Sequence, residues 1–388
     1  VMDYPTQSVC QLLSHNAQKR GDRPAIISES GSEMTHRDLL QQIDYGQTTL
    51  NRLGVGRNDR VAIVLPQSPE LAVAFLTVSG SATAAPLNHN YKRDDFLFYL
   101  EDLSAKALVL LEGDNTSARS AADELKVPII ELRPSEKQNG CFELLGEPGQ
   151  LPALGGLAEA DDVGLILHTS GTTSRPKMVP LTQENLFVSA SNIIRTAGLT
   201  TDDRCLNVMP LFHIHGLVAC ILASLGAGGS TVCTNSFDAG GFLAWLERFK
   251  PSWYSAVPTM HQAVLGQVRG PVKSSLRFIR SSSAALPPPV MEKLETIFSV
   301  PVIESYGMTE ATHQMASNPL PPLARKPGSV GIAAGPEICV LNDEDELLAQ
   351  GEIGEISIRG NNVTRGYEHN DEANASAFTN GWFRTGDQ

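Results

Sequence analysis

The amino-acid sequence predicts an α/β protein with largely parallel sheets covered by helices on both faces. Short apolar segments alternate with amphipathic segments along most of the 388-residue chain. The apolar segments are continuous runs, which is typical of parallel strands that are buried on both sides. The composition of 41% hydrophobic and 19% charged residues supports large buried cores.

The first half of the chain predicts this alternation element by element. Apolar residues recur with helical spacing in residues 7–20, 35–53, 68–79 and 117–125, which we expect to be helices. Between them, β-branched or continuous apolar runs predict strands at residues 23–27, 60–65, 107–111 and 127–132. Residues 163–167 look like the end of another buried strand.

The second half of the chain continues the alternation of strands and helices until about residue 319, where the sequence pattern changes. Helices are expected at residues 183–196 and 216–225, and strands at 277–281 and 302–306, with further segments of the alternation at 205–209, 230–233, 242–250 and 253–257. After about residue 319, glycines separate short β-like runs such as 337–341 and 354–359, which indicates antiparallel or barrel-like structure. Exposed loops are expected at residues 136–149 and 319–327.

Charge and cysteine usage exclude several function classes. The formal net charge of −13 disfavours a general nucleic-acid binder or a protein that binds anionic membranes. The six cysteines are scattered without zinc-like spacing, which predicts reduced, mostly buried thiols. No signal pattern or long apolar stretch is present, so we expect no membrane insertion and a cytoplasmic protein. A peroxisomal address would lie beyond residue 388, and the sequence leaves the oligomeric state open.

Residues 169–177 carry the strongest functional signal. The motif follows the strand expected at 163–167 and contains a glycine, several hydroxyl side chains and one lysine: Thr169, Ser170, Gly171, Thr172, Thr173 and Lys177. Backbone N–H groups in such a turn can converge on an anion, the glycine allows close approach, and the lysine supplies a positive charge. The spacing differs from that of a Walker-type loop. Alone, the motif fits either a polyphosphate cradle or a solvated turn.

Two further motifs lie downstream. Tyr306 and Gly307 follow the strand expected at 302–306, and the tyrosine ring can stack on a purine. Thr309 can donate to a phosphate, and Glu310 can hold a magnesium ion that bridges phosphate oxygens. Asp387 follows a glycine and could accept hydrogen bonds from ribose hydroxyls. Each of these motifs alone also fits a solvated turn.

The three motifs, in this order and at these separations, resemble those of the adenylate-forming superfamily of acyl-CoA synthetases, peptide-synthetase adenylation domains and luciferases. Residues 210–216 are also similar to the acyl-pocket segment of that superfamily, so the resemblance covers essentially the whole chain. It implies an AMP-binding N-terminal domain over residues 1–388. This domain would comprise two doubly wound αβα subdomains over approximately residues 1–318 and a small distorted β-barrel over 319–388.

The resemblance also implies a reaction and its site. A carboxylate attacks the α-phosphate of ATP to give an acyl-adenylate, and a thiol then displaces AMP. The implied catalytic residues are Lys177, Thr309, Glu310 and His213, and Glu310 would bind Mg²⁺. The implied nucleotide-binding residues are Thr169, Ser170, Gly171, Thr172, Thr173, Lys177, Tyr306, Gly307, Thr309 and Asp387. The thiol would be CoA or the phosphopantetheine of a carrier protein.

Several residues indicate which acid the chain takes. Ser174 replaces a glycine common among relatives, and residues 174–177 and 306–315 look similar to the oxalate-CoA ligase (peroxisomal-type CoA synthetase) branch. The expected lining of the acyl pocket is His213, Ser281, Ser283 and His313, whose donors suit the second carboxylate of oxalate or malonate. Alternatively, His213 only gates the pocket and His313 caps a helix. Amino-acid activation is disfavoured because no acidic residue lies between Pro210 and Gly216.

Three hypotheses follow for the function. The first is the core of an acid-CoA ligase, and the second is an adenylation core that loads a carrier protein. The third is a nucleotide-binding scaffold without activity. Superfamily members continue past the turn at residues 384–387 into a small domain that carries a second catalytic lysine. The chain is expected to lack that domain and to be weakly active alone.

Overall fold

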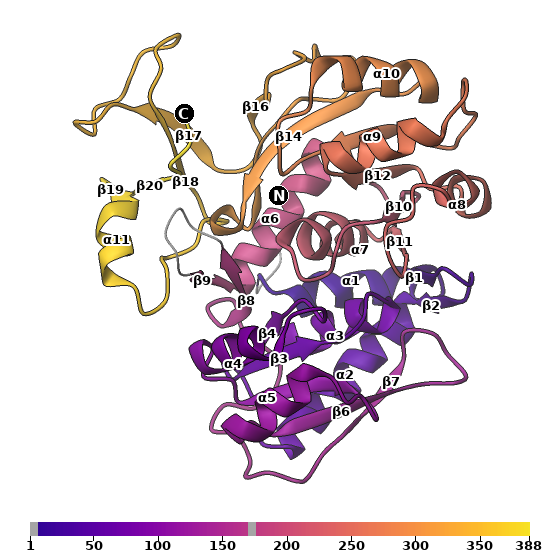
Figure 1. Cartoon of the computed structure of the whole chain (residues 1–388), viewed down its shortest axis with the longest axis vertical. Helices are drawn as coiled ribbons and strands as arrows, with labels where there is room; N and C mark the ends of the chain where they lie inside the picture. Colours follow the sequence, from indigo (N-terminus) through magenta and orange to yellow (C-terminus); the bar gives the residue numbers. More distant parts are fainter. Residues whose placement is uncertain (1–6, 170–175) are drawn as a thin grey trace.

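The computed structural model describes residues 7–169 and 176–388 and contains three sheets (Figure 1). A seven-stranded sheet has the order β7-β6-β5-β3-β4-β8-β9. Its inner pairs are parallel, and the edge strands β7 and β9 are antiparallel to their neighbours. The strands are β3 (Arg60–Val64), β4 (Thr83–Pro86), β5 (Ala107–Leu111), β6 (Ile129–Pro134), β7 (Phe142–Leu145), β8 (Val163–Thr169) and β9 (Lys177–Thr182).

A nine-stranded sheet has the order β16-β15-β14-β13-β12-β10-β11-β1-β2. Its strands are parallel from β14 to β1, and β2, β15 and β16 are antiparallel to their neighbours. The strands are β1 (Pro24–Ser28), β2 (Glu33–Thr35), β10 (Arg204–Asn207), β11 (Ser230–Cys233), β12 (Trp253–Ala256), β13 (Phe278–Ser281), β14 (Val302–Met308), β15 (His313–Ser317) and β16 (Ile332–Ala333). The chain therefore begins in this sheet, builds the other one, and returns.

Helices fill three layers around these two sheets, as Figure 1 shows. The layer between the sheets belongs to one buried apolar cluster and contains α1 (Val9–Arg20), α2 (His36–Arg52), α3 (Pro69–Ser79), α6 (Gln183–Thr196), the π-helical η1 (His215–Leu222) and α7 (Ala223–Gly226). The outer face of the seven-stranded sheet is covered by α4 (Arg93–Asp102) and α5 (Ser117–Leu125). The outer face of the nine-stranded sheet is covered by α8 (Phe242–Phe249), α9 (Pro258–Gln267) and α10 (Pro288–Phe298).

Strand β3 shows why its sequence is continuously apolar. Val61 and Ile63 face the central helices, whereas Ala62 and Val64 face α4 and α5. Successive side chains of a strand point to opposite faces, so a strand with helices on both sides needs apolar residues at every position. This doubly covered arrangement is the α/β fold that the alternating pattern predicts.

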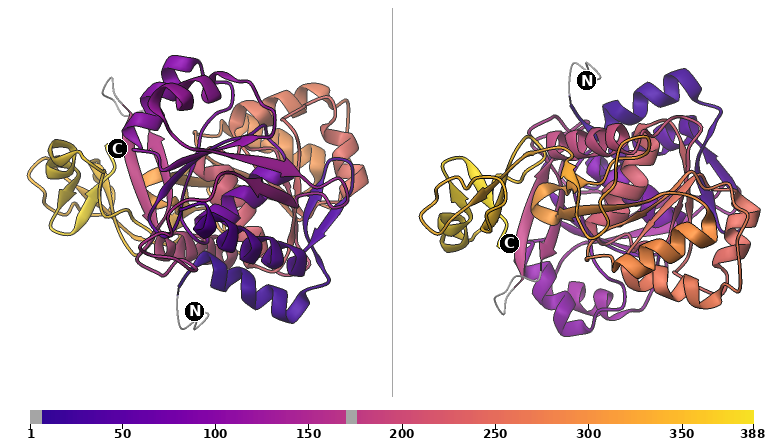
Figure 2. Two further views of the ribbon diagram at one scale, coloured as in Figure 1. Left: turned by 90° about the horizontal axis from the view of Figure 1, so that it is seen from below. Right: turned by 90° about the horizontal axis from the view of Figure 1, so that it is seen from above.

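A small antiparallel sheet lies to one side of this body, and Figure 2 shows it projecting from the two larger sheets. Its order is β17-β18-β20-β19, with strands β17 (Glu337–Leu341), β18 (Glu355–Arg359), β19 (Phe378–Thr379) and β20 (Trp382–Arg384). Helix α11 (Asp371–Ala377) precedes β19. Within the described residues, β17 and β19 form open edges, so this region is an antiparallel sheet and its strand order does not close into a barrel.

One expected loop is wrong in part. Residues 136–149 contain β7, which pairs antiparallel with β6. Phe142 and Leu144 are buried and Glu143 between them is exposed, because this edge strand has one apolar face. The expected helix at residues 216–225 begins instead as the π-helix η1 and continues as α7.

All six cysteines have free thiols in this structure, and four of them are buried, as expected: Cys10, Cys205, Cys220 and Cys233. Burial raises the pKa of the Cys10 thiol to about 12 and that of Cys141 to about 11. Among the described residues, no helix is both long and apolar enough to cross a membrane.

Candidate active site

The residues of the first motif lie on the hairpin of β8 and β9. Thr169 ends β8 and is paired directly with Lys177, the first residue of β9. Ser170, Gly171, Thr172 and Thr173 lie outside the described residues. The antiparallel register therefore places one hydroxyl and the lysine side by side at the two ends of the expected phosphate loop.

The second motif spans the end of β14, where Tyr306 and Gly307 pair with β15, and the turn that follows it. A Cβ atom on Gly307 would lie 1.9 Å from the carbonyl oxygen of His313, so only glycine fits this bulged pairing. His313 has φ 101°, which is strained for a residue with a side chain. Thr309 and Glu310 form the 3₁₀ turn η2 (Thr309–Ala311), in which the Glu310 side chain is buried.

We predict that Gly307→Ala destabilises the protein by about 1–3 kcal/mol, because the added methyl forces β14 and β15 apart. Gly266→Ala is the matched control, since a Cβ there has nothing within 4 Å. The control is expected to be neutral or to stabilise by about 0.5 kcal/mol, because alanine restricts the unfolded chain. Urea unfolding curves measure both effects, and equal midpoints for the two variants would contradict the prediction.

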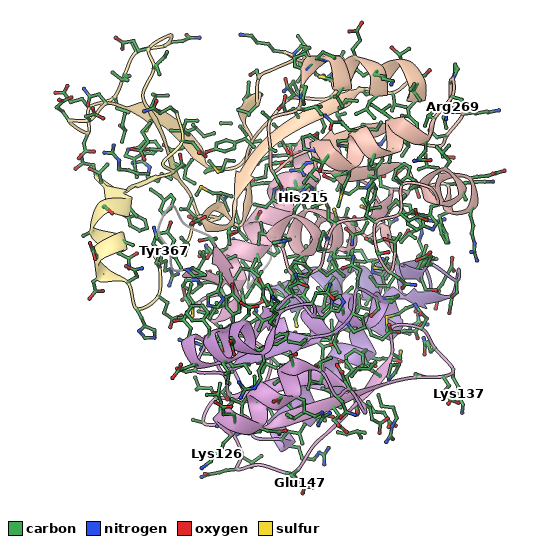
Figure 3. The ribbon with its side chains drawn as sticks, viewed as in Figure 1. Lys126, Lys137, Glu147, His215, Arg269 and Tyr367 are labelled. Carbon is green, nitrogen blue, oxygen red and sulfur yellow. The ribbon has the colours of Figure 1, made fainter. Side chains whose placement is uncertain are left out.

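Tyr367 connects the first two motifs, although no sequence pattern marks it as a site residue. The Lys177 ammonium lies 4.6 Å from the centre of the Tyr367 ring, and the Tyr367 hydroxyl donates to Glu310 Oε1 at 2.8 Å. Figure 3 labels Tyr367 between the small sheet and strands β8 and β9. Burial and the neighbouring Glu310 carboxylate raise the pKa of Tyr367 well above its usual value. The tyrosine therefore remains a proton donor that orients the carboxylate.

The segment before Tyr367 holds the backbone of the glutamate turn. Thr364 donates its backbone N–H to the Glu310 carbonyl at 2.7 Å, and the Asn362 amide donates to the Ala311 carbonyl at 2.8 Å. The Thr364 hydroxyl donates to the carbonyl of Pro180 on β9. This segment fixes Glu310 relative to β9 and hence relative to Lys177.

The third motif meets the second across a pocket of about 640 Å³. The Tyr306 hydroxyl donates to the Asp387 carboxylate, and both residues line this pocket together with Gly307, Ser283 and Ile356. Burial, followed by this contact with Asp387, raises the pKa of Tyr306 well above its usual value. The pocket therefore offers an aromatic ring and a carboxylate side by side.

A polar cluster borders this pocket beneath β13. His215, near the centre of the molecule in Figure 3, contacts Ser283 Oγ through Nδ1 at 3.0 Å and Ser255 Oγ through Nε2 at 2.6 Å. Arg280 donates to Ser255 Oγ at 3.1 Å and to His313 Nδ1 at 3.4 Å. The His215 and His313 rings lie edge to face with centroids 5.0 Å apart.

Two of the expected lining residues do not join this cluster. On β13, Phe278 packs into the central layer and Ile279 into the outer layer, so strand alternation directs Arg280 inward and Ser281 outward. Ser281 is fully buried on that outer face, and its hydroxyl has no hydrogen-bond partner among the described residues. His213 is exposed beside Phe212. Of the expected lining residues, the structure brings Ser283 and His313 to the cluster.

Three residues of the cluster were not anticipated as site residues. His215 stands in the expected acyl-pocket segment two residues after His213, and Ser255 lies in an apolar strand. Arg280 is fully buried, and burial lowers its pKa to about 10, so it stays a cation at neutral pH. A single arginine between Ile279 and Ser281 in an otherwise apolar strand was the available signal.

Comparisons with known proteins agree with this geometry. The family model described as AMP-binding enzyme matches residues 13–368. The oxalate–CoA ligase of Arabidopsis thaliana is 41% identical over 408 residues, covering 100% of this chain and 77% of the relative. The oxalate–CoA ligase of Saccharomyces cerevisiae is 39% identical over 398 residues, covering 94% of this chain and 73% of the relative.

The crystal structure of ATP-bound MatB from Rhodopseudomonas palustris superimposes with a TM-score of 0.84 at 27% identity, covering 98% of this chain and 76% of that one. The chain thus spans about three quarters of the length of these proteins. These matches confirm the resemblance drawn from the three motifs. The family model spans most of the chain and both ligases match nearly all of it, so the chain belongs to the AMP-binding enzyme family and is a ligase of the acyl-CoA synthetase type.

Proposed function

We propose that this ligase activates a small dicarboxylic acid, with oxalate favoured, through an acyl-adenylate and transfers the acyl group to CoA. The observation that carries the choice of acid is the buried Arg280 beside Ser283, His215 and His313 at the edge of the nucleotide pocket. A buried cation and hydroxyl and imidazole donors suit a second carboxylate, whereas a fatty chain needs an apolar lining. The names of the two oxalate–CoA ligase relatives support the same choice.

The nucleotide roles follow from the positions of the motifs. We propose that Thr169, Lys177 and the intervening loop bind the ATP phosphates, and that Lys177 stabilises charge on the transferred phosphoryl group. Tyr306 and Gly307 would face the adenine, and Asp387 would accept from the ribose hydroxyls. Thr309 would donate to a phosphate, and exposed His213 would close the entrance to the acyl pocket.

Glu310 fits a magnesium ion that enters with the nucleotide. Mg²⁺ prefers oxygen ligands and is usually held by one or two protein carboxylates, with phosphate oxygens and waters completing its shell. Glu310 supplies one buried carboxylate, which Tyr367 orients through Oε1. When bound there, the ion would neutralise charge on the phosphate oxygens.

The test is pyrophosphate release by the full-length protein with CoA and Mg²⁺ present. The acids to compare are oxalate, malonate, acetate, a medium-chain fatty acid, a cinnamate and several amino acids. We expect oxalate to give the highest kcat/KM and His313→Asn to lower it by about 10- to 100-fold, since one hydrogen bond to a charged group is lost. Asparagine is chosen because it tolerates positive φ.

His369→Asn is the control, because the His369 side chain is exposed and also has positive φ. Its activity with oxalate is expected to equal that of the wild type. A preference for a monocarboxylate would overturn the proposed acid. The proposed acceptor would be overturned if pyrophosphate release were equal with and without CoA and the acid were retained on a carrier protein.

A further inference from the structure

Arg280 is a buried cation without a carboxylate partner. Its side chain is fully buried, and in the part of the chain that the structure describes no ion pair joins it to an acidic residue. Its hydrogen bonds go to neutral groups, namely Ser255, His313 and Gln314. Burying an uncompensated guanidinium costs several kcal/mol, so its retention indicates a role in the adjacent pocket.

The chemistry of arginine fixes the direction of the first two hydrogen bonds. A guanidinium only donates, so Ser255 Oγ must accept from Arg280 Nη1. Among the described residues, the other hydrogen-bond partner of Ser255 Oγ is His215 Nε2 at 2.6 Å. A serine oxygen can accept twice, but among the described residues the Ser255 hydroxyl proton has no acceptor other than His215 Nε2, so it points to this nitrogen, which accepts it.

The same reasoning gives the direction of the hydrogen bond from His215 to Ser283, which lines the pocket. Burial and nearby Arg280 hold the pKa of His215 well below its usual value, so the ring is neutral and carries its one proton on Nδ1. Nδ1–H donates to Ser283 Oγ at 3.0 Å. The Ser283 hydroxyl has thereby received a hydrogen bond and keeps its own proton to donate into the pocket that it lines.

Two further observations support a functional role for this series of hydrogen bonds. Ser283 is held at φ 70°, a conformation that costs energy for a residue with a side chain. Arg280 also donates to His313 Nδ1 at 3.4 Å, which leaves the His313 proton on Nε2. The same cation thus sets the proton positions of both histidines.

We propose that Arg280 is a positioning residue that sets the direction of the hydrogen bonds from Arg280 through Ser255 and His215 to Ser283. The Ser283 hydroxyl then presents a polarised donor to the pocket, which selects acids with a second, anionic carboxylate. This inference rests on the proposed function for its substrate class. Its structural part stands by itself, because hydrogen bonds in such a chain polarise one another whatever ligand enters.

The first test is the tautomer of His215, read from the ¹⁵N chemical shifts of histidine-labelled protein without substrate. Comparison with His215→Gln assigns the signal among the nine histidines. We expect the Nδ1–H tautomer in the wild type, its loss in Arg280→Met and Ser255→Ala, and its retention in Arg280→Lys. Arg277→Met is the matched control, because Arg277 precedes the same strand but pairs with Asp203.

The second test is substrate preference in the full-length protein. The ratio of kcat/KM for oxalate to that for acetate is expected to fall at least about 10-fold in Arg280→Met, mainly through the KM for oxalate, while the KM for ATP stays unchanged. If Arg280→Met does not fold, Ser255→Ala breaks the chain and leaves the cation in place, and the same fall is expected.

The outcomes separate the two proposals. The positioning role would be overturned by an Nε2–H tautomer of His215 in the wild type. It would also be overturned if both the tautomer and the substrate ratio stayed unchanged in Arg280→Met and Ser255→Ala. An Nδ1–H tautomer that is lost in both variants, in a wild type that prefers monocarboxylates, would support the chain and overturn the proposed acid.

Discussion

Glu310→Gln is expected to slow pyrophosphate release by about 100-fold or more at saturating ATP and acid. Glu310 is the buried carboxylate that the structure places next to Lys177 through Tyr367. The amide keeps the size of the side chain but loses the charge that would hold Mg²⁺ on the phosphates. Removing one stabilising group from a charged transition state typically costs about 100- to 1,000-fold in rate.

The measurement is initial rate against Mg²⁺ concentration in the full-length protein. Glu310→Gln should need much more Mg²⁺ for half-maximal rate, and Tyr367→Phe should show a smaller shift because it removes only the orienting hydrogen bond. Glu337→Gln is the control, since Glu337 is exposed in an ion pair with Arg359 on the small sheet. A Glu310→Gln enzyme with wild-type rate and Mg²⁺ dependence would refute the assigned role.

The free energy of unfolding is expected to fall steeply as pH drops from 7 towards 5. His215, His261 and His313 are buried, and burial lowers the pKa of each, to about 4 for His261. In the unfolded chain each takes up a proton near pH 6.5, whereas in the native state it does not. Stability therefore rises with pH between the folded and unfolded pKa values and is lost as pH falls through this window.

Each such histidine contributes about 1.4 kcal/mol per pH unit, so these three add about 4 kcal/mol per unit at the steepest point. Desolvation also lowers the pKa values of three further histidines, which act in the same direction: His36, His168 and His213. Burial raises the pKa of Glu304, and this shift affects the slope with the opposite sign. Urea unfolding at pH 7.5, 6.5 and 5.5 measures the slope. His261→Gln should reduce the slope by the contribution of about one proton, and exposed His369→Gln should leave the slope unchanged. An unfolding free energy that did not vary with pH would contradict the three assignments.

The sequence predicted the helices and strands whose pattern is set by local residues. α5 and α6 begin and end as expected, because Ala-rich or amphipathic segments follow clear capping residues such as Thr182. β9 was missed because Pro180 interrupts it, and the structure tolerates this proline because β9 is an edge strand. α9 and α10 are not among the expected helices; each begins with a proline, Pro258 or Pro288, which is favoured in the first turn of a helix.

The candidate site was predictable only where its chemistry is local in sequence. Thr169, Lys177, Tyr306, Glu310 and Asp387 stand in short motifs, so residue type and spacing were enough to select them. Tyr367 and Arg280 act through partners far along the chain, 57 residues away for Glu310 and 25 for Ser255. Their contacts depend on how three sheets pack, which single-sequence patterns do not record.

The protonation state of the cysteine side chains matters in an enzyme that transfers its acyl group to a thiol. The pKa values of Cys10, Cys141, Cys205, Cys233 and Cys339 are raised, and burial is the largest cause at each of them. Only a thiolate attacks an activated acyl group or a disulfide at a useful rate. These five side chains therefore stay protonated at neutral pH, so they do not compete with the incoming thiol for the acyl group.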